Sequence, residues 1–135
     1  MKKYIYKTRV RYGEVDRMGT VYYGNYFLYM ESARTGLLRE AGLPYSTMED
    51  RGIMLPVTET NCKYKNFLRF DEEIVVETSL EYIRNASVKI KYRIKNAEGK
   101  MIALGYTIHP FINKDWKIVN IPEEIREKIE IYLEE

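Results

Sequence analysis

The sequence predicts an α+β protein in which one long helix packs against a mainly antiparallel, five-stranded sheet, with a short helix near the C-terminal end. Only one long segment has apolar residues at helical spacing, and most of the remaining apolar segments alternate as strands do. A glycine-containing turn joins two of those strands as a hairpin. With 135 residues and 45% hydrophobic composition, the chain can bury one sizeable core, so we expect a single domain over residues 1–135.

The first third of the chain is expected to contain a strand, a loop and the long helix. Residues 3–11 alternate as a strand does, and residues 12–22 form the loop. A helix is predicted over residues 23–41, because its apolar side chains recur at helical spacing. Gly42 and the following Pro44 form a stop signal, and the sequence PYSTMEDRG then predicts one short helical turn.

The rest of the chain is predicted to be mostly strand. The expected strands cover residues 53–64, 73–83, 87–97 and 101–113. In the third of these, four apolar residues alternate with a basic set, which is Lys89, Lys91, Arg93 and Lys95. One face of that strand should therefore pack on the helix while the other carries charge. The chain should close with a helix that begins at Pro122 and has an apolar stripe formed by Ile125, Ile129, Tyr132 and Leu133.

Composition excludes several classes of protein. A net charge of +2 is too small to indicate nucleic-acid binding or attachment to a membrane surface. No segment approaches the ~20 apolar residues of a membrane span, and Lys7 and Arg9 interrupt any signal-peptide core. A single cysteine, Cys62, suits a reducing cytoplasm, and one histidine with one cysteine leaves too few ligands for a zinc site.

The loop before the long helix contains the residues best suited to catalysis. Asp16 lies seven residues before Tyr23, where the helix is predicted to begin. A helix N-terminus offers unpaired backbone N–H groups that can polarise a carbonyl, and a nearby carboxylate can attack it or activate a water. Gly24 leaves room for a substrate, and Asn25 can cap the helix or hold the loop. The alternative is that Asp16 only forms a turn, which is the commoner role of Asp in such loops.

The sequence RYGEVDRMGTVYYGNYFLYMESAR resembles the signature of the 4-hydroxybenzoyl-CoA thioesterase family of hotdog-fold proteins. It is most similar to the bacterial short-chain acyl-CoA thioesterases associated with the Tol-Pal system. The order of predicted elements also matches that family over nearly the whole chain. The matching residues are Asp16, Gly19, Val21, Tyr22, Asn25, Tyr26, Glu31, Ala33 and Arg34.

The resemblance implies a hotdog fold and roles for two residues. Asp16 matches the family's catalytic carboxylate, which acts as nucleophile or general base in different members. Tyr23 matches the residue whose backbone N–H polarises the thioester carbonyl, although several Tol-Pal-type relatives have His at this position. The family works without metal or organic cofactor. Its active sites lie at a dimer interface, and many members are dimers of dimers, so we expect a homodimer or homotetramer.

Substrate contacts are expected from three groups of residues. Tyrosine is unusually abundant, with 13 copies, and we expect Tyr22, Tyr26, Tyr29 and Tyr64 to line an acyl pocket or, alternatively, to fill the core. Family members tend to contact the nucleotide end of CoA at positions that match Arg84, Asn85 and Ser87. The basic set can hold CoA phosphates, but a solvated or subunit-facing surface is the preferred interpretation.

Three other residues or pairs have competing interpretations. Glu14 is expected to be solvated or to orient its neighbours. Glu31 is a reserve catalytic carboxylate, because hotdog relatives of another branch use a helix carboxylate, but an i,i+3 ion pair with Arg34 is the simpler explanation. Cys62 and His109 are expected to be a buried small side chain and a hydrogen-bonded strand histidine, with no thiol–imidazole pair.

The leading hypothesis is an acyl-CoA thioesterase that hydrolyses a short-chain or aromatic acyl-CoA to a free acid and CoA. One alternative is a hotdog protein that binds acyl-CoA without catalysis, since fold does not fix function. Another is a hotdog hydratase or dehydratase. Such enzymes use an Asp–His or His–Glu pair, whereas the one histidine here is far from the motif in sequence.

Overall fold

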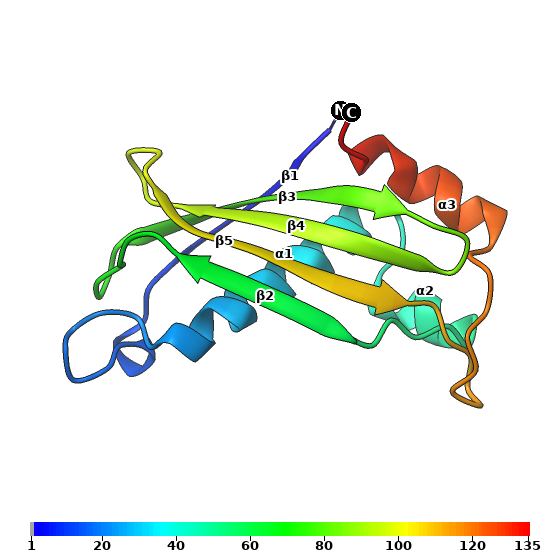
Figure 1. Ribbon diagram of the computed structural model, residues 1–135, viewed down its shortest axis with the longest axis horizontal. Helices are drawn as coiled ribbons and strands as arrows, with labels where there is room; N and C mark the ends of the chain where they lie inside the picture. The colour runs from blue at the N-terminus through cyan, green and yellow to red at the C-terminus, as the bar shows by residue number, and fades with distance from the viewer. Residues whose placement is uncertain (1) are drawn as a thin grey trace.

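A five-stranded antiparallel sheet curves around one long helix in the computed structural model, which describes residues 2–135 (Figure 1). The strand order in the sheet is β1-β3-β4-β5-β2. The strands are β1 (Tyr4–Arg9), β2 (Glu59–Tyr64), β3 (Glu73–Ile83), β4 (Ser87–Lys95) and β5 (Met101–Pro110). The helices are α1 (Tyr26–Glu40), α2 (Tyr45–Asp50) and α3 (Glu123–Ile129). This is the hotdog arrangement that the resemblance implies, and its predicted long and short helices are confirmed.

Three short 3₁₀ turns complete the structure. They are η1 (Tyr12–Glu14), η2 (Tyr23–Asn25) and η3 (Glu130–Tyr132). The predicted start of the long helix at Tyr23 is the start of a 3₁₀ turn. The α-helix itself begins at Tyr26. No helix among residues 2–135 is long and apolar enough to cross a membrane.

Four of the five predicted strands are shorter than expected, and only β3 has its predicted bounds. The predicted strands 3–11 and 87–97 are observed as Tyr4–Arg9 and Ser87–Lys95. The prediction of one extended segment over 53–64 was wrong, because β2 begins only at Glu59. Pro56 cannot donate a backbone hydrogen bond, and before it only Met54 bridges to Ile112. The last strand was predicted to reach residue 113 but ends at Pro110, after which Phe111 and Ile112 donate backbone hydrogen bonds to Ala86 and Met54.

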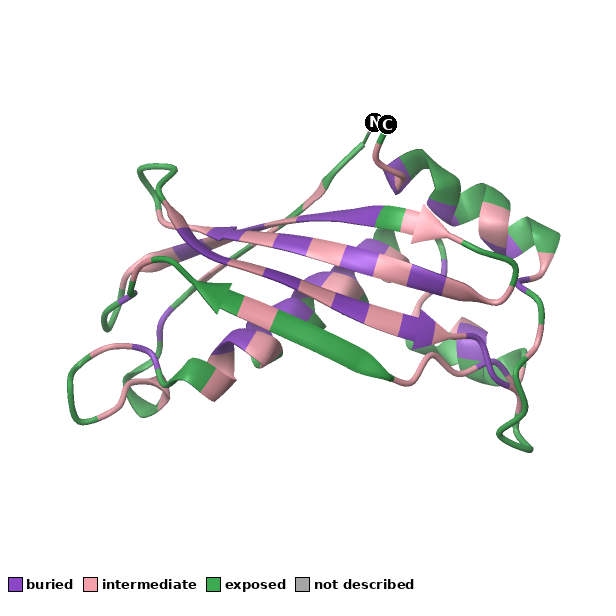
Figure 2. Cartoon of the chain, in the orientation of Figure 1, coloured by how far each residue is buried: buried purple, intermediate pink, exposed green. Residues whose placement is uncertain are grey.

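Strand β4 has one buried face and one charged face, as predicted. Its residues alternate between buried and half-buried along the whole strand (Figure 2). The basic side chains pair with carboxylates of neighbouring elements. Lys89 lies 2.9 Å from Glu81 and Lys95 lies 2.9 Å from Glu77. Glu134 lies 3.3 Å from Arg93 and 3.8 Å from Lys91. These pairs favour the surface interpretation of the basic set over a phosphate site.

Helix α1 packs against the sheet where two glycines leave room for larger side chains. A Cβ added to Gly105 of β5 would overlap the Cε methyl of buried Met30 on α1 and would lie 3.0 Å from the backbone oxygen of Asn61. A Cβ added to Gly36 of α1 would overlap the hydroxyl of Tyr4 on β1. A larger side chain at either glycine would force its neighbour to move.

A chain of hydrogen bonds runs through the core beneath α1. The guanidinium of Arg34 donates to the hydroxyl of Tyr92 (3.2 Å), which shares a hydrogen bond with the Thr107 hydroxyl (2.8 Å). Thr107 is also 2.8 Å from Nε2 of His109, whose Nδ1 is 3.0 Å from the backbone oxygen of Leu55. Every member therefore has a partner, which is what buried polar groups require.

His109 is neutral inside this network. Its side chain is fully buried, and burial lowers its pKa to about 4, with the nearby positive charge of Arg34 adding to the effect. The expectation of a hydrogen-bonded strand histidine is confirmed. Cys62 is a half-buried free thiol on β2, and its partner position on β5 is Gly105.

The buried histidine predicts a pH dependence of stability. The unfolded chain takes up a proton on His109 near pH 6.5 while the folded chain resists until about pH 4, so the free energy of unfolding should fall as pH drops through this window. The expected loss is at most roughly 3 kcal/mol. Urea unfolding at several pH values should show this component in the wild type and not in His109→Gln.

The same prediction can be checked directly. Since the chain has one histidine, its imidazole NMR signals are unambiguous and should not titrate between pH 7.5 and 5.5 in the folded protein. A midpoint near 6.5 would contradict the burial of a neutral ring.

Candidate functional site

The loop that contains Asp16 is held in one conformation by its own backbone. The N–H of Asp16 donates to the oxygen of Thr20 (2.8 Å), and the N–H of Tyr22 donates to the oxygen of Glu14 (2.9 Å). Gly19 has a φ of 81°, a left-handed conformation that glycine adopts without strain, and its N–H donates to the oxygen of Asp16 (3.0 Å). The loop therefore closes on itself just before the helix start.

Asp16 uses one carboxylate oxygen for this turn. Its Oδ1 accepts a hydrogen bond from the N–H of Met18 at 2.9 Å, which is the contact a turn-forming Asp makes. The side chain is half-buried. No donor from the residues that the structure describes is bonded to the other oxygen. The turn role and a chemical role are compatible, because they use different oxygens.

The helix start next to this loop presents free backbone donors. Within residues 2–135, no group accepts a hydrogen bond from the N–H of Tyr23 or Gly24, the first two residues of η2. The carbonyl oxygen of Tyr23 points the other way and accepts from the Tyr64 hydroxyl at 2.9 Å. A side chain at position 24 would contact the Tyr22 ring, with its Cβ 2.9 Å from Cε2. Gly24 therefore leaves room for the Tyr22 ring, whereas the sequence predicted room for a substrate.

Glu14 and Asn25 join the loop to the helix. The amide of Asn25 donates to the Glu14 backbone oxygen (2.9 Å), so it holds the loop and does not cap the helix. The Glu14 carboxylate accepts from the Tyr29 hydroxyl (3.0 Å) and from the N–H of Arg11 (2.8 Å). Burial, and then the bond to Glu14, raise the pKa of Tyr29. Glu14 therefore orients its neighbours, as expected.

The tyrosines of the motif divide into two groups. Tyr26 and Tyr29 are only 2% and 4% exposed and belong to the core, where burial raises the pKa of Tyr26 to about 12. Tyr22 and Tyr23 are exposed, with ring centroids 4.5 Å apart. Tyr64, which is partly exposed, lies edge-on to Tyr23 at 6.5 Å. Tyr22, Tyr23 and Tyr64, and not the two buried tyrosines, are therefore the exposed rings at the start of the helix.

Sequence reasoning missed a second group of exposed apolar residues at this end of the molecule. The segment after β2 docks on the Asp16 loop, because the N–H of Val21 donates to the oxygen of Leu68 (2.9 Å). It brings Phe70 against Tyr12, with ring centroids 5.7 Å apart. Large exposed apolar side chains near the loop are Tyr12, Met18, Phe67 and Phe70. No periodic pattern marks them in the sequence, so only the folded chain gathers them.

Arg84, Asn85 and Ser87 do not join Asp16 within one chain. They lie at the turn between β3 and β4, whereas the Asp16 loop lies at the opposite end of the sheet (Figure 1). Strand β3, with 11 residues, separates the two ends by about 33 Å. The turn is bonded to the C-terminal segment: Arg126 donates to the oxygen of Arg84 (2.7 Å), and the N–H of Ile121 donates to the oxygen of Asn85 (2.8 Å).

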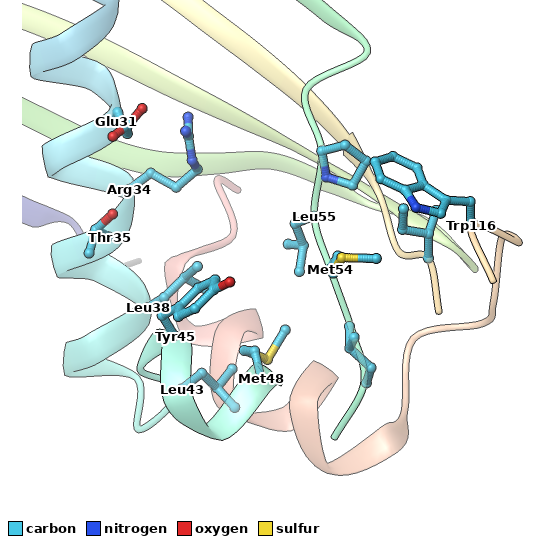
Figure 3. Close-up of a pocket in the computed structure, with 13 residues that line it drawn as sticks. Glu31, Arg34, Thr35, Leu38, Leu43, Tyr45, Met48, Met54, Leu55 and Trp116 are labelled. Carbon is cyan, nitrogen blue, oxygen red and sulfur yellow. The ribbon is translucent and has the colours of Figure 1, made fainter. Parts of the chain in front are cut away.

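Glu31 lies away from Asp16, at a cavity of about 420 Å³ beside the second half of α1 (Figure 3). It is exposed, and the expected ion pair with Arg34 is absent from the described residues, since Arg34 instead donates to Tyr92. The cavity was not foreseen. Its wall residues come from four separate segments, and only their folding brings them together.

Comparisons with known proteins agree with the geometry. The thioesterase-like superfamily matches residues 10–129. A Bacillus subtilis (strain 168) protein with the provisional name acyl-CoA thioesterase YneP is 37% identical over 106 residues, which cover 78% of this chain and 77% of that protein. The solved structure of DHNA-CoA thioesterase from Staphylococcus aureus is 31% identical, with a TM-score of 0.89 over 97% of this chain and 93% of that one. The gentisyl-coenzyme A thioesterase BH1999 is 30% identical, with a TM-score of 0.83 over 90% and 98% of the two chains.

Proposed function

The chain belongs to the thioesterase-like superfamily, and from this premise we propose that it hydrolyses a short-chain or aromatic acyl-CoA thioester to a free carboxylic acid and CoA. One observation carries the proposal. The Asp16 carboxylate has one unbonded oxygen, and its loop is joined through the Glu14 backbone oxygen to a helix start whose first two N–H groups have no acceptor among the described residues. This pairing of a carboxylate with free N–H donors suits attack on a carbonyl.

In the proposed mechanism, the thioester carbonyl oxygen accepts a hydrogen bond from the N–H of Tyr23. Its carbon is then attacked either by Asp16 itself or by a water that Asp16 deprotonates. The negative charge that develops on the oxygen is stabilised by the N–H and by the positive end of α1. The C–S bond breaks, and CoA leaves as a thiolate that takes up a proton. In the nucleophilic route, water then hydrolyses the mixed anhydride and restores Asp16.

The substrate class is inferred from the rings around the site. Tyr22, Tyr23 and Tyr64 are rigid apolar surfaces next to the N–H donors, which suits a flat or short acyl group better than a long chain. The names of the two solved thioesterases, which act on aromatic acyl-CoA, support the same class. We propose that Arg84, Asn85 and Ser87 hold the nucleotide end of CoA at a site of a neighbouring subunit, because within one chain they lie at the far end of the sheet. We place the enzyme in the cytoplasm, where its one thiol stays reduced.

We expect a homodimer at least. Tyr12, Met18 and Phe67 are each more than 70% exposed in the single chain, and grouped apolar surface of this kind marks an interface. Light scattering at micromolar concentration should give twice or four times the 16.1 kDa chain mass. A monomer would count against both the interface and the placement of the CoA contacts.

Asp16→Asn tests the chemical role of the carboxylate. The amide oxygen can still accept from the Met18 N–H, so the turn should survive while the charge is lost. We expect kcat to fall by on the order of 10² to 10⁴, about 2.7–5.5 kcal/mol of barrier, with oligomeric state and thermal stability unchanged. Thiol release from a panel of acyl-CoAs measures it.

The matched control is Glu98→Gln, which makes the same chemical change on an exposed residue of the β4–β5 turn and should leave kcat at the wild-type value. If Asp16→Asn keeps more than about a third of kcat, the loss is under 1 kcal/mol and Asp16 is only a turn former.

Tyr23→Pro tests the backbone donor. Proline is tolerated at the first position of a helical turn, and the preceding Tyr22 already has the extended backbone (φ −57°, ψ 131°) that proline requires. The N–H removed has no acceptor in the described protein, so stability should change little. We expect kcat to fall by on the order of 10² to 10³ relative to Tyr23→Ala, which loses the same side chain but keeps the N–H. Equal kcat in the two variants would exclude the proposed oxyanion contact.

The alternative of an acyl-CoA-binding protein without catalysis predicts CoA thioester binding with no thiol release by the wild type. A hydratase or dehydratase is disfavoured, because the only histidine is buried and neutral beneath α1, away from the Asp16 loop.

A further inference from the structure

Two turns of this chain share a sequence pattern and a set of hydrogen bonds. Residues 96–100 read NAEGK, and residues 113–117 read NKDWK. In each turn, the asparagine side-chain oxygen accepts from the backbone N–H groups two and four residues later, at 2.8–3.1 Å. The N–H of the fourth residue also donates to the asparagine carbonyl oxygen, at 3.0 Å in both turns. The two turns are therefore a matched pair within one protein.

The fourth residue of this turn has a left-handed backbone, and the two turns place different residues there. Gly99 has a φ of 82° in the first turn, and Trp116 has a φ of 60° in the second. Glycine adopts this conformation without strain, whereas a residue with a Cβ is strained in it and a bulky residue rarely adopts it. Trp116 therefore destabilises the fold at a position where the same chain elsewhere has glycine.

The Trp116 side chain gains little from packing. It is 71% exposed, and among residues 2–135 it contacts no other aromatic ring face or edge and has no cation over it. The ring lies across the cavity from α1, next to the segment that contains Met54 and Leu55 (Figure 3). Strained residues occur mainly at functional sites, so the exposed ring is best explained by a ligand that it contacts.

Two lysines flank Trp116 at the tip of the turn. Lys114 and Lys117 are exposed, and neither forms an ion pair among the described residues. The stem of Lys114 lies against Gly52, where an added Cβ would be 3.2–3.6 Å from its carbons. Asp115 opposes an anion here, but it is exposed and its charge is screened by solvent. A flat ring between two cations suits a ligand that combines an aromatic base with phosphates.

The hairpin that carries Trp116 starts at the β3–β4 turn, where we place the nucleotide end of CoA. The N–H of Phe111 donates to the oxygen of Ala86, and the N–H of Ile121 donates to the oxygen of Asn85, each at 2.8 Å. Trp116 is at the tip of the hairpin between these two bonds, at the same end of the molecule (Figure 1). It is five residues from Phe111, so its backbone lies within about 17 Å of this base. An extended CoA molecule is longer than that and can contact both places.

We propose that Trp116 is a stacking platform for the adenine ring of CoA, with Lys114 and Lys117 beside the phosphates of the nucleotide. The proposal rests on the proposed function, because the ligand is the coenzyme part of the thioester substrate. An aromatic acyl group is also flat, but it has no phosphate to meet the two lysines, so the nucleotide is the better fit.

Fluorescence titration of the full-length protein tests the platform directly, because Trp116 is the only tryptophan. CoA and adenosine 3′,5′-bisphosphate should both quench its emission with saturation at millimolar concentration or below. Phosphopantetheine, which lacks the adenosine, should leave the emission unchanged. No response to the two adenosine ligands, or an equal response to phosphopantetheine, would overturn the proposal.

Trp116→Gly copies the matched turn and separates binding from folding. Its melting temperature should equal or exceed that of the wild type, because the backbone strain is removed. The Kd for CoA and the KM for benzoyl-CoA should rise by about fivefold or more, with kcat changed by less than about twofold. The KM for the benzoyl thioester of N-acetylcysteamine, which has no nucleotide, should stay at the wild-type value. Trp116→Phe keeps a ring and should restore part of the CoA affinity.

Gly99→Trp is the reciprocal control, because its turn lies at the opposite end of the sheet (Figure 1). It should lower the melting temperature by a few degrees and leave CoA binding unchanged.

An equal rise in KM for the two benzoyl thioesters would assign Trp116 to the acyl group and overturn the platform. Unchanged CoA affinity in Trp116→Gly would overturn it as well. Thiol release by a wild type whose fluorescence ignores adenosine ligands would leave the thioesterase and remove the platform. Quenching by CoA without any thiol release would do the reverse.

Discussion

The packing of α1 against the sheet is the constraint on which the rest of the structure depends. At Gly105 of β5, the Met30 side chain of α1 fills the space that a Cβ would occupy. A similar contact recurs at Gly36, where a Cβ would overlap the hydroxyl of Tyr4 on β1. With the helix fixed at this height, its first turn meets the Asp16 loop and its second half forms one wall of the cavity. The packing of α1 therefore positions both the Asp16 loop and the cavity.

Charge is distributed in keeping with this arrangement. The outer face of the sheet has many charged groups, but the basic residues of β4 are paired with Glu77, Glu81 and Glu134, so their fields largely cancel near the surface. The buried histidine is neutral. Near α1, the carboxylates of Asp16 and Glu31 and the guanidinium of Arg34 form no ion pair among the described residues.

Much of the fold could be predicted because its signals are local. The 3.6-residue spacing of α1, the two-residue alternation of β4 and the turn at Gly99 each lie within a short window of sequence. The errors arose where a single residue overrides the pattern, as Pro56 does when it delays β2 to Glu59. For the candidate site, sequence reasoning named Asp16 and the unpaired backbone N–H groups at the helix start. It treated the turn role and the chemical role of Asp16 as alternatives, whereas the carboxylate has one oxygen for each. The cavity and its unpaired Arg34 depend on contacts between distant segments, which no local pattern encodes.

The two ends of the described chain lie side by side, so the chain could be circularly permuted. The N–H of Lys2 donates to the oxygen of Ile131 at 3.0 Å, and Glu134 pairs with the backbone of Leu80 next to β1 (Figure 1). A short glycine-rich linker could join these ends, and new ends could be opened in the exposed turn at 97–100. Such a circular permutant would begin with β5 and end with β4, yet the order of strands in the sheet would be the same. The hotdog architecture thus depends on which elements lie next to one another in space and not on the order in which they occur along the chain.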